Sequence, residues 1–118
     1  MTDIPEQERS ITEEFRIVAN QFVEADGAAS LMEEMKTTQL AQMKSNLMAI
    51  EGDMSDARAE RLVKSGSEWP EYIENMVENR TKANKLKLQL EWIRMREREL
   101  DRSSWLERSE RKMGRSVT

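Results

Sequence analysis

Residues 67–100 read SEWPEYIENMVENRTKANKLKLQLEWIRMREREL, and this stretch decides the fold. Its apolar residues recur at alternating steps of three and four, the spacing of one face of a long helix in a coiled coil. This main stripe contains Trp69, Tyr72, Met76, Ala83, Leu86, Leu90, Ile93 and Leu100, interrupted by Asn79 and Glu97. We therefore expect one long C-terminal helix.

A second apolar stripe, formed by Leu88, Trp92 and Met95, lies on roughly the opposite side of the same helix. A helix that is apolar on two faces must be covered from two directions, either by helices of its own chain or by a partner chain. We favour an oligomer. The predicted core or oligomer-interface residues are Trp69, Tyr72, Met76, Leu86, Leu90, Trp92, Ile93 and Leu100.

Two further helical segments precede this one. Ser10 to Glu13 fits a capping box, and it leads into an amphipathic face with Phe15, Val18, Ala19, Phe22 and Val23. Gly27 either ends this helix or only weakens it. A second stripe follows, with Leu40, Met43, Leu47, Ile50 and Met54.

The segment between residues 52 and 70 contains helix-terminating and helix-starting residues. Gly52 is expected to end or disturb the preceding helix, and Ser55 or Asp56 to cap a short helix running through Val63. Gly66 suits the left-handed position after a helix end. Ser67 is a candidate cap for the last helix, with Pro70 tolerated in its first turn.

The composition agrees with an all-α fold that has a thin core. Apolar residues make up 37% of the 118 residues and charged residues 36%, with only 4 Gly and 2 Pro. We expect a helical hairpin or bundle of three or four helices with a long C-terminal helix, assembling as a coiled-coil-like oligomer. The helical domain is predicted over residues 10–112, with a disordered lead-in over 1–9 and a disordered tail over 113–118.

The residue types disfavour an enzyme. The chain has no Cys and no His, which excludes nucleophile–histidine catalysis and zinc sites built from thiolates or imidazoles. Glu71 and Glu74 have the ExxE spacing that holds magnesium in all-helical nucleotide pyrophosphatases, but the second acidic pair of such a site is missing. We expect a non-enzymatic protein without metal or cofactor. No apolar run approaches the roughly 18 residues of a membrane span, and the acidic N-terminal residues lack the apolar region of a signal peptide, so we expect no membrane association and a cytoplasmic location.

The charge is distributed asymmetrically. Residues 1–79 carry 7 basic and 17 acidic side chains, a net charge of -10, whereas residues 80–118 carry 12 basic and 6 acidic ones, a net charge of +6. A row of cations gains binding free energy from phosphates by releasing counterions, and an interleaved tryptophan stacks on bases. The predicted nucleic-acid-binding residues are Lys85, Arg98, Arg102, Trp105, Arg108, Arg111, Lys112 and Arg115.

A structural interpretation of the basic residues stays open beside this one. The acidic N-terminal helices would lie antiparallel to the basic helix, whose cations would flank the seam and pair with acids. The cations concerned are Lys82, Lys87, Arg94 and Arg96, and the acids are Glu13, Glu14, Glu24, Glu33 and Glu34. The overall net charge of -4 favours weak binding made strong by an oligomer, or docking on another protein.

The stretch from Ser67 to Glu99 resembles small helical proteins encoded in tailed phages and prophages, often beside recombination or replication genes. The order K-x-K-x-x-L-E followed by Trp and Arg is more distantly similar to the tail of phage recombination mediators of the UvsY type. The matching positions are Lys85, Lys87, Leu90, Glu91, Trp105 and Arg108. This resemblance implies a helical, oligomeric protein that binds single-stranded DNA and helps to load a recombinase in an infected or lysogenic bacterial host.

Two functional hypotheses follow. The first is a non-enzymatic phage accessory protein that binds single-stranded nucleic acid, a recombination protein, or both. The second is a protein-interaction module, such as an acidic phage inhibitor of a host defence or nucleic-acid-processing complex. In the second hypothesis the acidic N-terminal surface is the active one, because it imitates the charge of a nucleic acid. The expected partners are further copies of the chain, single-stranded DNA, and a recombinase or host protein.

Overall fold

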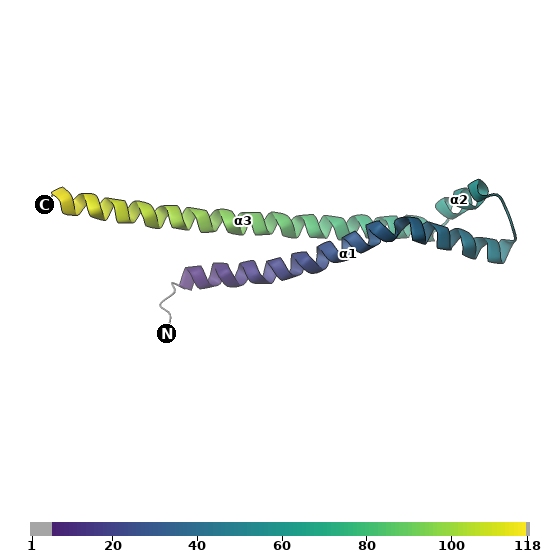
Figure 1. Ribbon diagram of the computed structural model, residues 1–118, viewed down its shortest axis with the longest axis horizontal. Helices are drawn as coiled ribbons and strands as arrows, with labels where there is room; N and C mark the ends of the chain where they lie inside the picture. The colour runs from purple at the N-terminus through teal and green to yellow at the C-terminus, as the bar shows by residue number, and fades with distance from the viewer. Residues whose placement is uncertain (1–5, 118) are drawn as a thin grey trace. The chain divides into compact units, whose positions relative to one another are not determined.

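The computed structural model describes the backbone of residues 6–117 and the side chains of residues 10–113, and within them the chain is all-α (Figure 1). Helix α1 spans Glu6–Glu51, α2 spans Asp56–Ser65 and α3 spans Glu68–Val117. The predicted fold class and the long C-terminal helix are confirmed. None of the helices in this part of the chain is apolar over a stretch long enough to cross a membrane.

Both long helices exceed their predicted bounds. Helix α1 begins at Glu6, so Ser10 lies inside the helix and the predicted capping box does not start it. Good helix formers precede Ser10, and the acidic side chain of Glu6 is favourable at the positive end of a helix dipole. Helix α3 continues to Val117, beyond the predicted limit at Lys112, because no proline stops it. Residues 1–5 and 118 lie outside the described residues.

The glycine within α1 and the glycine that directly follows it behave differently. The helix passes through Gly27 without a break, which answers the question that the sequence left open. It ends at Glu51 because Gly52 adopts a φ of 95°, a left-handed conformation that glycine reaches without steric cost. The amide of Gly52 donates to the carbonyl of Met48 over 2.9 Å, which satisfies one carbonyl of the last turn.

Helix α2 begins as predicted and ends differently. The hydroxyl of Ser55 caps it by accepting from the amide of Arg58 over 3.2 Å. Gly66 has an extended backbone, with φ of -79° and ψ of -174°, so the predicted left-handed conformation is wrong. Glycine is favoured there because its amide closes on the carbonyl of Val63, which would lie only 3.3 Å from an added Cβ.

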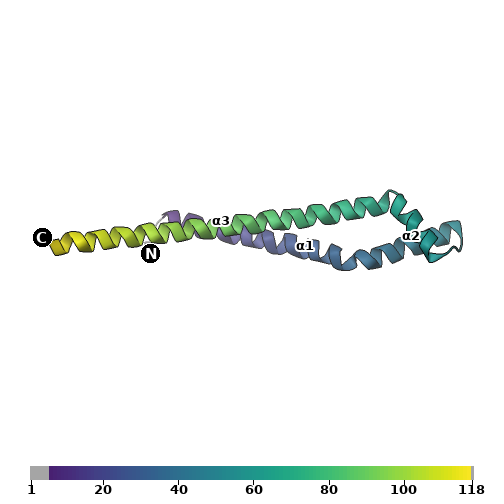
Figure 2. The same cartoon turned by 90° about the horizontal axis from the view of Figure 1, so that it is seen from above.

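The chain divides into two compact units. The central unit consists of Phe22–Asn84, and the terminal unit combines Met1–Gln21 with Lys85–Thr118. Within each unit α1 and α3 run antiparallel, as their opposite colour gradients show (Figure 2). Buried apolar side chains of the central unit are Ala25, Ala29, Ala59, Trp69 and Ala83, and those of the terminal unit are Val18, Leu90 and Ile93.

The predicted core residues of α3 fall into three groups according to their burial. Trp69, Leu90 and Ile93 are buried, as predicted. Tyr72, Met76 and Leu86 are half-buried. Leu100 is 36% exposed and Trp92 is 71% exposed, so neither belongs to the core of a single chain. In the terminal unit α1 covers only one side of α3, and Trp92 lies on the other side.

Candidate nucleic-acid interface

The C-terminal part of α3 extends beyond the described part of α1. In the terminal unit Glu14 faces Arg96, and α1 starts eight residues before Glu14. Because two antiparallel helices advance equally, α3 beyond about residue 104 extends past the start of α1 (Figure 1). The predicted nucleic-acid-binding residues from Trp105 onward therefore lie on the part of α3 that extends past the start of α1.

Basic residues further upstream on α3 are held by α1, as the structural interpretation predicted. In the terminal unit a guanidinium nitrogen of Arg96 lies 2.7 Å from a carboxylate oxygen of Glu14. The guanidinium of Arg94 lies 5.5 Å from the centre of the Phe15 ring, a cation–π distance. Lys82 and Lys87, in contrast, are exposed and form no ion pair with another described residue.

The most extensive ion-pair network between α1 and α3 among the described residues is in the central unit, around Arg80, and it was not predicted from the sequence. Arg80 pairs with Glu33 at 2.6 Å and with Asp26 at 2.8 Å, and it also donates to the hydroxyl of Ser30. The hydrogen bond from Arg80 lowers the pKa of Glu33, and the same bond raises the pKa of Arg80. The sequence signal was the seven-residue spacing of Asp26 and Glu33, which places two acids on one side of α1.

The cations of the predicted interface differ from Arg80, Arg94 and Arg96. Five of them are exposed and form no ion pair with any residue whose side chain the structure describes. These five are Lys85, Arg98, Arg102, Arg108 and Arg111. Lys112 is also exposed, and the side chain of Arg115 lies outside the described residues. The charge of Lys85, Arg98, Arg102, Arg108 and Arg111 therefore remains available to an external anion.

Trp105 is the aromatic residue at the centre of this basic segment. It is 65% exposed, so its indole face is accessible to a planar ligand. Arg98 and Lys112 lie seven residues away on either side, while Arg102 and Arg108 lie three residues away. Side chains at these spacings lie on the same side of a helix, so four cations surround the indole.

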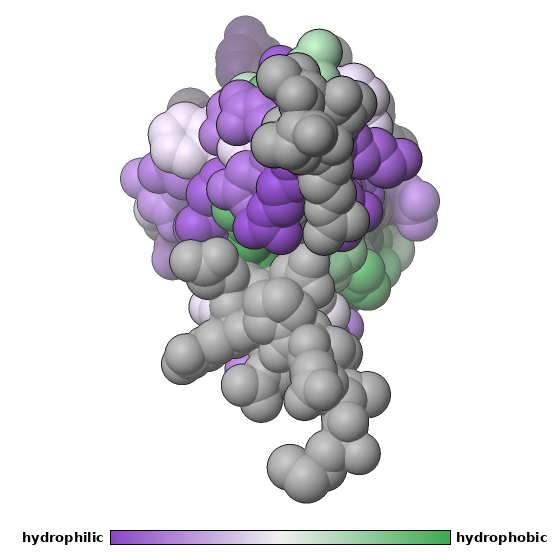
Figure 3. All heavy atoms as spheres, turned by 90° about the vertical axis from the view of Figure 1, so that its left-hand side faces the viewer, coloured by the Kyte–Doolittle hydropathy of each residue, from purple (hydrophilic) through white to green (hydrophobic). Residues whose placement is uncertain are grey.

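The second predicted stripe of α3 is uncovered in the single chain. Leu88, Trp92 and Met95 are 56%, 71% and 55% exposed. Leu106 and Met113 continue the stripe and are 49% and 69% exposed. Figure 3 shows mostly hydrophilic residues on its visible face, with hydrophobic residues exposed beside them.

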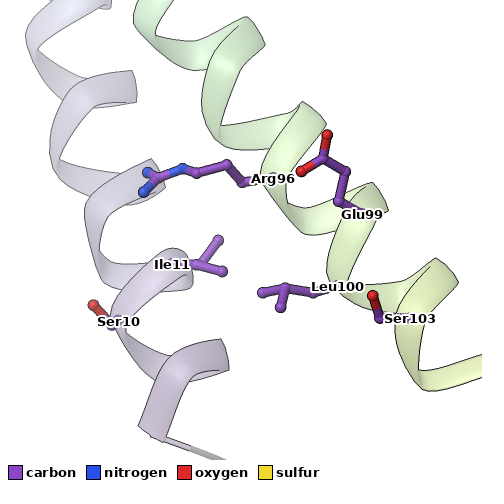
Figure 4. Close-up of a pocket in the computed structure, with 6 residues that line it drawn as sticks. All are labelled: Ser10, Ile11, Arg96, Glu99, Leu100 and Ser103. Carbon is purple, nitrogen blue, oxygen red and sulfur yellow. The ribbon is translucent and has the colours of Figure 1, made fainter. Parts of the chain in front are cut away.

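A shallow pocket of about 470 Å³ lies between α1 and α3 in the terminal unit. Figure 4 shows Ile11 and Leu100 directed toward each other across it, with Arg96 reaching toward α1 above them. Glu99, Ser10 and Ser103 complete the lining. The pocket is open, and this explains why Leu100, predicted to be core, remains partly exposed.

No group of three or more acidic side chains that might hold a metal ion occurs among the described residues. Comparisons of the chain with protein-family models, with curated proteins and with solved structures found no match.

Proposed function

We propose that this chain is a non-enzymatic accessory protein that binds single-stranded nucleic acid through the C-terminal part of α3. The observation that carries the proposal is Trp105, which is 65% exposed and surrounded by cations on its own side of the helix. Exposure of a tryptophan has no benefit for the fold of one chain, whereas a stacking platform requires it.

The division of the arginines supports this proposal over the structural interpretation. Arg80 and Arg96 are used by acids of α1, but Arg98, Arg108 and Arg111 are not paired with described residues. Phosphates would provide the missing counter-charges, and the planar guanidinium binds a phosphate through two parallel hydrogen bonds. Bases splayed from a single strand would stack on Trp105, whereas the bases of a duplex are already stacked on each other.

The net charge of -4 limits the strength of binding by one copy. Since a few phosphate contacts give weak, salt-sensitive binding, several copies acting together are needed for tight binding. We therefore propose a homo-oligomer. The resemblance to phage recombination mediators adds a recombinase as a second partner and the cytoplasm of a bacterial host as the location.

The first test measures binding of a labelled single-stranded oligonucleotide at several salt concentrations. The wild-type chain should bind at low salt, and its affinity should fall steeply as salt is added. Replacing Arg108 and Arg111 together by Gln should reduce the slope of log K against log salt by about 0.7 for each arginine. The matched control replaces Arg58 and Arg61 by Gln, because these exposed α2 residues change the net charge equally and lie in the other unit.

The second test follows tryptophan fluorescence during the same titration. Trp69 is 8% exposed, so quenching on binding should come from the exposed tryptophans. Trp105→Phe should remove most of the quenching and retain affinity, since phenylalanine also stacks. Trp105→Ala should weaken binding by about 1–3 kcal/mol per base lost. Absence of binding at low salt by the wild-type chain would overturn the proposal.

The alternative function assigns activity to the acidic residues of α1. Glu13, Glu24 and Glu34 are exposed and form no ion pair within the described part of the chain, unlike Glu14 and Glu33. A protein partner that normally binds nucleic acid would recognise such a surface by its charge. The two proposals are separated by the Arg108 and Arg111 double variant, which should lose the first activity and retain the second.

A further inference from the structure

The exposed stripe of α3 has the pattern of a coiled-coil seam. Leu88, Trp92, Met95, Leu106 and Met113 follow steps of three and four, with Glu99, Arg102 and Ser109 occupying the intervening seam positions. The stripe spans about three and a half heptads, enough for a stable coiled coil. Its apolar residues lie opposite the side that carries the buried residues Leu90 and Ile93, and Glu99 also borders the open pocket between α1 and α3.

We propose that a second copy of the chain packs antiparallel on this stripe. In the proposed register Glu99 of each copy lies beside Arg102 of the other, on either side of a two-fold axis. Moving outward, Met95 packs on Leu106, Trp92 on Ser109 and Leu88 on Met113 of the other copy. Each layer then joins an a position to a d position, which is the arrangement of antiparallel coiled coils.

The two charged seam positions select this arrangement. In a parallel pair Glu99 would face Glu99 and Arg102 would face Arg102, and like charges within a seam are repulsive. Sliding the antiparallel pair by one heptad in either direction would place Arg102 against Trp92 or Leu106, leaving a charge without a counter-charge in an apolar layer. In the single chain neither Glu99 nor Arg102 forms an ion pair with a described residue.

The residues that flank the seam are also complementary in this register. Glu91 of one copy lies beside Lys112 of the other, and Arg98 lies beside Trp105 of the other. The first pair joins opposite charges, and the second joins a guanidinium to an indole. No pair of like charges meets along this edge, and this complementarity favours a second copy over an unrelated partner.

The arrangement also deepens the proposed function, and this step rests on that function. Both copies of Trp105 would lie on the same edge of the dimer, separated by nine residues along α3, about 13.5 Å. One single strand would then reach both indoles and Arg108 of each copy. Arg102 would belong to the dimer interface rather than to the nucleic-acid surface.

The experiment measures the mass of the full chain in solution by light scattering or sedimentation. The wild type should have twice the mass of one 13.8 kDa chain. Trp92→Glu should be a monomer with unchanged helix content, because it places a charge in the seam. The matched control is Ile17→Glu, which alters an α1 residue that is 52% exposed and lies outside the stripe. A monomeric wild type, or a Trp92→Glu variant that remains dimeric, would overturn the inference.

A charge exchange tests the register. Glu99→Arg and Arg102→Glu should each lose the dimer, since each leaves like charges face to face. Mixing the two variants should restore a dimer, because each copy then supplies the charge that the other needs. Failure of the mixture to associate, or full association of either variant alone, would contradict the proposed register.

Cysteine cross-linking tests the orientation without interference, because the native chain has no cysteine. Met95→Cys mixed with Leu106→Cys should give a mixed disulfide-linked pair. A parallel dimer would instead link each variant to itself and overturn the orientation. The outcomes are separable from the proposed nucleic-acid binding: a dimer that does not bind an oligonucleotide contradicts only that binding, and a monomer that binds one contradicts only the proposed association.

Discussion

At the scale of single residues, Gly27 within α1 and Gly52 directly after it have opposite requirements. Gly27 lies within the helix, and a Cβ added there would meet no atom within 4 Å. Gly52 also has open space around it, but its φ of 95° is strained for any residue with a Cβ. The same substitution should therefore change stability in opposite directions at the two positions.

Gly27→Ala should raise the free energy of unfolding by about 0.5–1 kcal/mol, because alanine loses less conformational entropy in a helix. Gly52→Ala should lower it by about 1–2 kcal/mol, the cost of a left-handed conformation for an L-residue. Urea denaturation of both variants measures these changes. A loss of stability in Gly27→Ala would mean that the helix is interrupted at this glycine.

The carboxylate of Glu33 makes part of the stability depend on pH. Its folded-state pKa lies below the ordinary value of 4.5 because Arg80 donates hydrogen bonds to it. A lowered pKa contributes stability above the unfolded-state pKa, and this contribution is lost as the pH falls through the folded-state pKa. Glu33→Gln should therefore show a smaller loss of stability than the wild type between about pH 6 and pH 3.

The control for this prediction is the neighbouring Glu34→Gln. Glu34 is exposed and has no ion pair with a described residue, so its replacement should leave the wild-type pH dependence in place. Urea denaturation at both pH values gives the comparison. Equal pH dependence in all three proteins would show that Arg80 does not stabilise the ionised form of Glu33.

Local chemistry explains which residue-level predictions succeeded. Ser55 caps α2 and Gly52 ends α1 because each acts through its own backbone and the nearest turn. The left-handed conformation expected at Gly66 was wrong, since an extended glycine also ends a helix when its amide reaches a carbonyl three residues back. Sequence alone does not distinguish these two uses of glycine.

At the scale of helices, the pairing of α1 with α3 in the central unit depends on small residues. Ala29 on α1 and Ala83 on α3 have no exposed surface. Alanine at such positions lets two helix backbones approach closely. Ala83 belonged to the predicted main stripe, but the burial of Ala29 was not predicted. Large apolar side chains mark a buried stripe in a sequence, whereas alanines occur on buried and exposed positions alike.

Ala29→Leu should lower the free energy of unfolding by about 1–3 kcal/mol, since a larger side chain must separate the helices or adopt a strained rotamer. The matched control is Ala28→Leu, which adds the same atoms at the adjacent exposed position. Thermal denaturation followed by circular dichroism distinguishes the two. Similar melting temperatures for both variants would mean that the helices are not in close contact at Ala29.

Periodicity predicted the helices better than it predicted their buried sides. Val23 and Ile50 belonged to predicted apolar faces of α1, yet they are 66% and 81% exposed. A pair of helices buries only a narrow seam, so residues at the edge of a broader apolar face stay outside it. The exposure of Trp92 has the same geometric cause on α3.

At the scale of the whole molecule, the sequence predicted the helix order and the basic character of the last segment. It did not predict which arginines α1 would hold, because that depends on the antiparallel register in each unit. The pairs formed by Arg80 and Arg96 set those registers and separate the structural cations from the remaining ones. Which basic residues of α3 are left for a nucleic acid is therefore decided by the pairing of α1 with α3 within each unit.

The proposed dimer predicts that thermal stability depends on protein concentration. Only folded copies associate, so a higher protein concentration favours the folded state. The melting temperature of the wild type should therefore rise by several degrees over about a hundredfold increase in concentration. Trp92→Glu should melt at one temperature throughout this range, whereas Ile17→Glu should follow the wild type. Circular dichroism or calorimetry at matched concentrations gives the result. A wild-type melting temperature that does not change with concentration would show that the stripe from Leu88 to Met113 does not join copies of this chain.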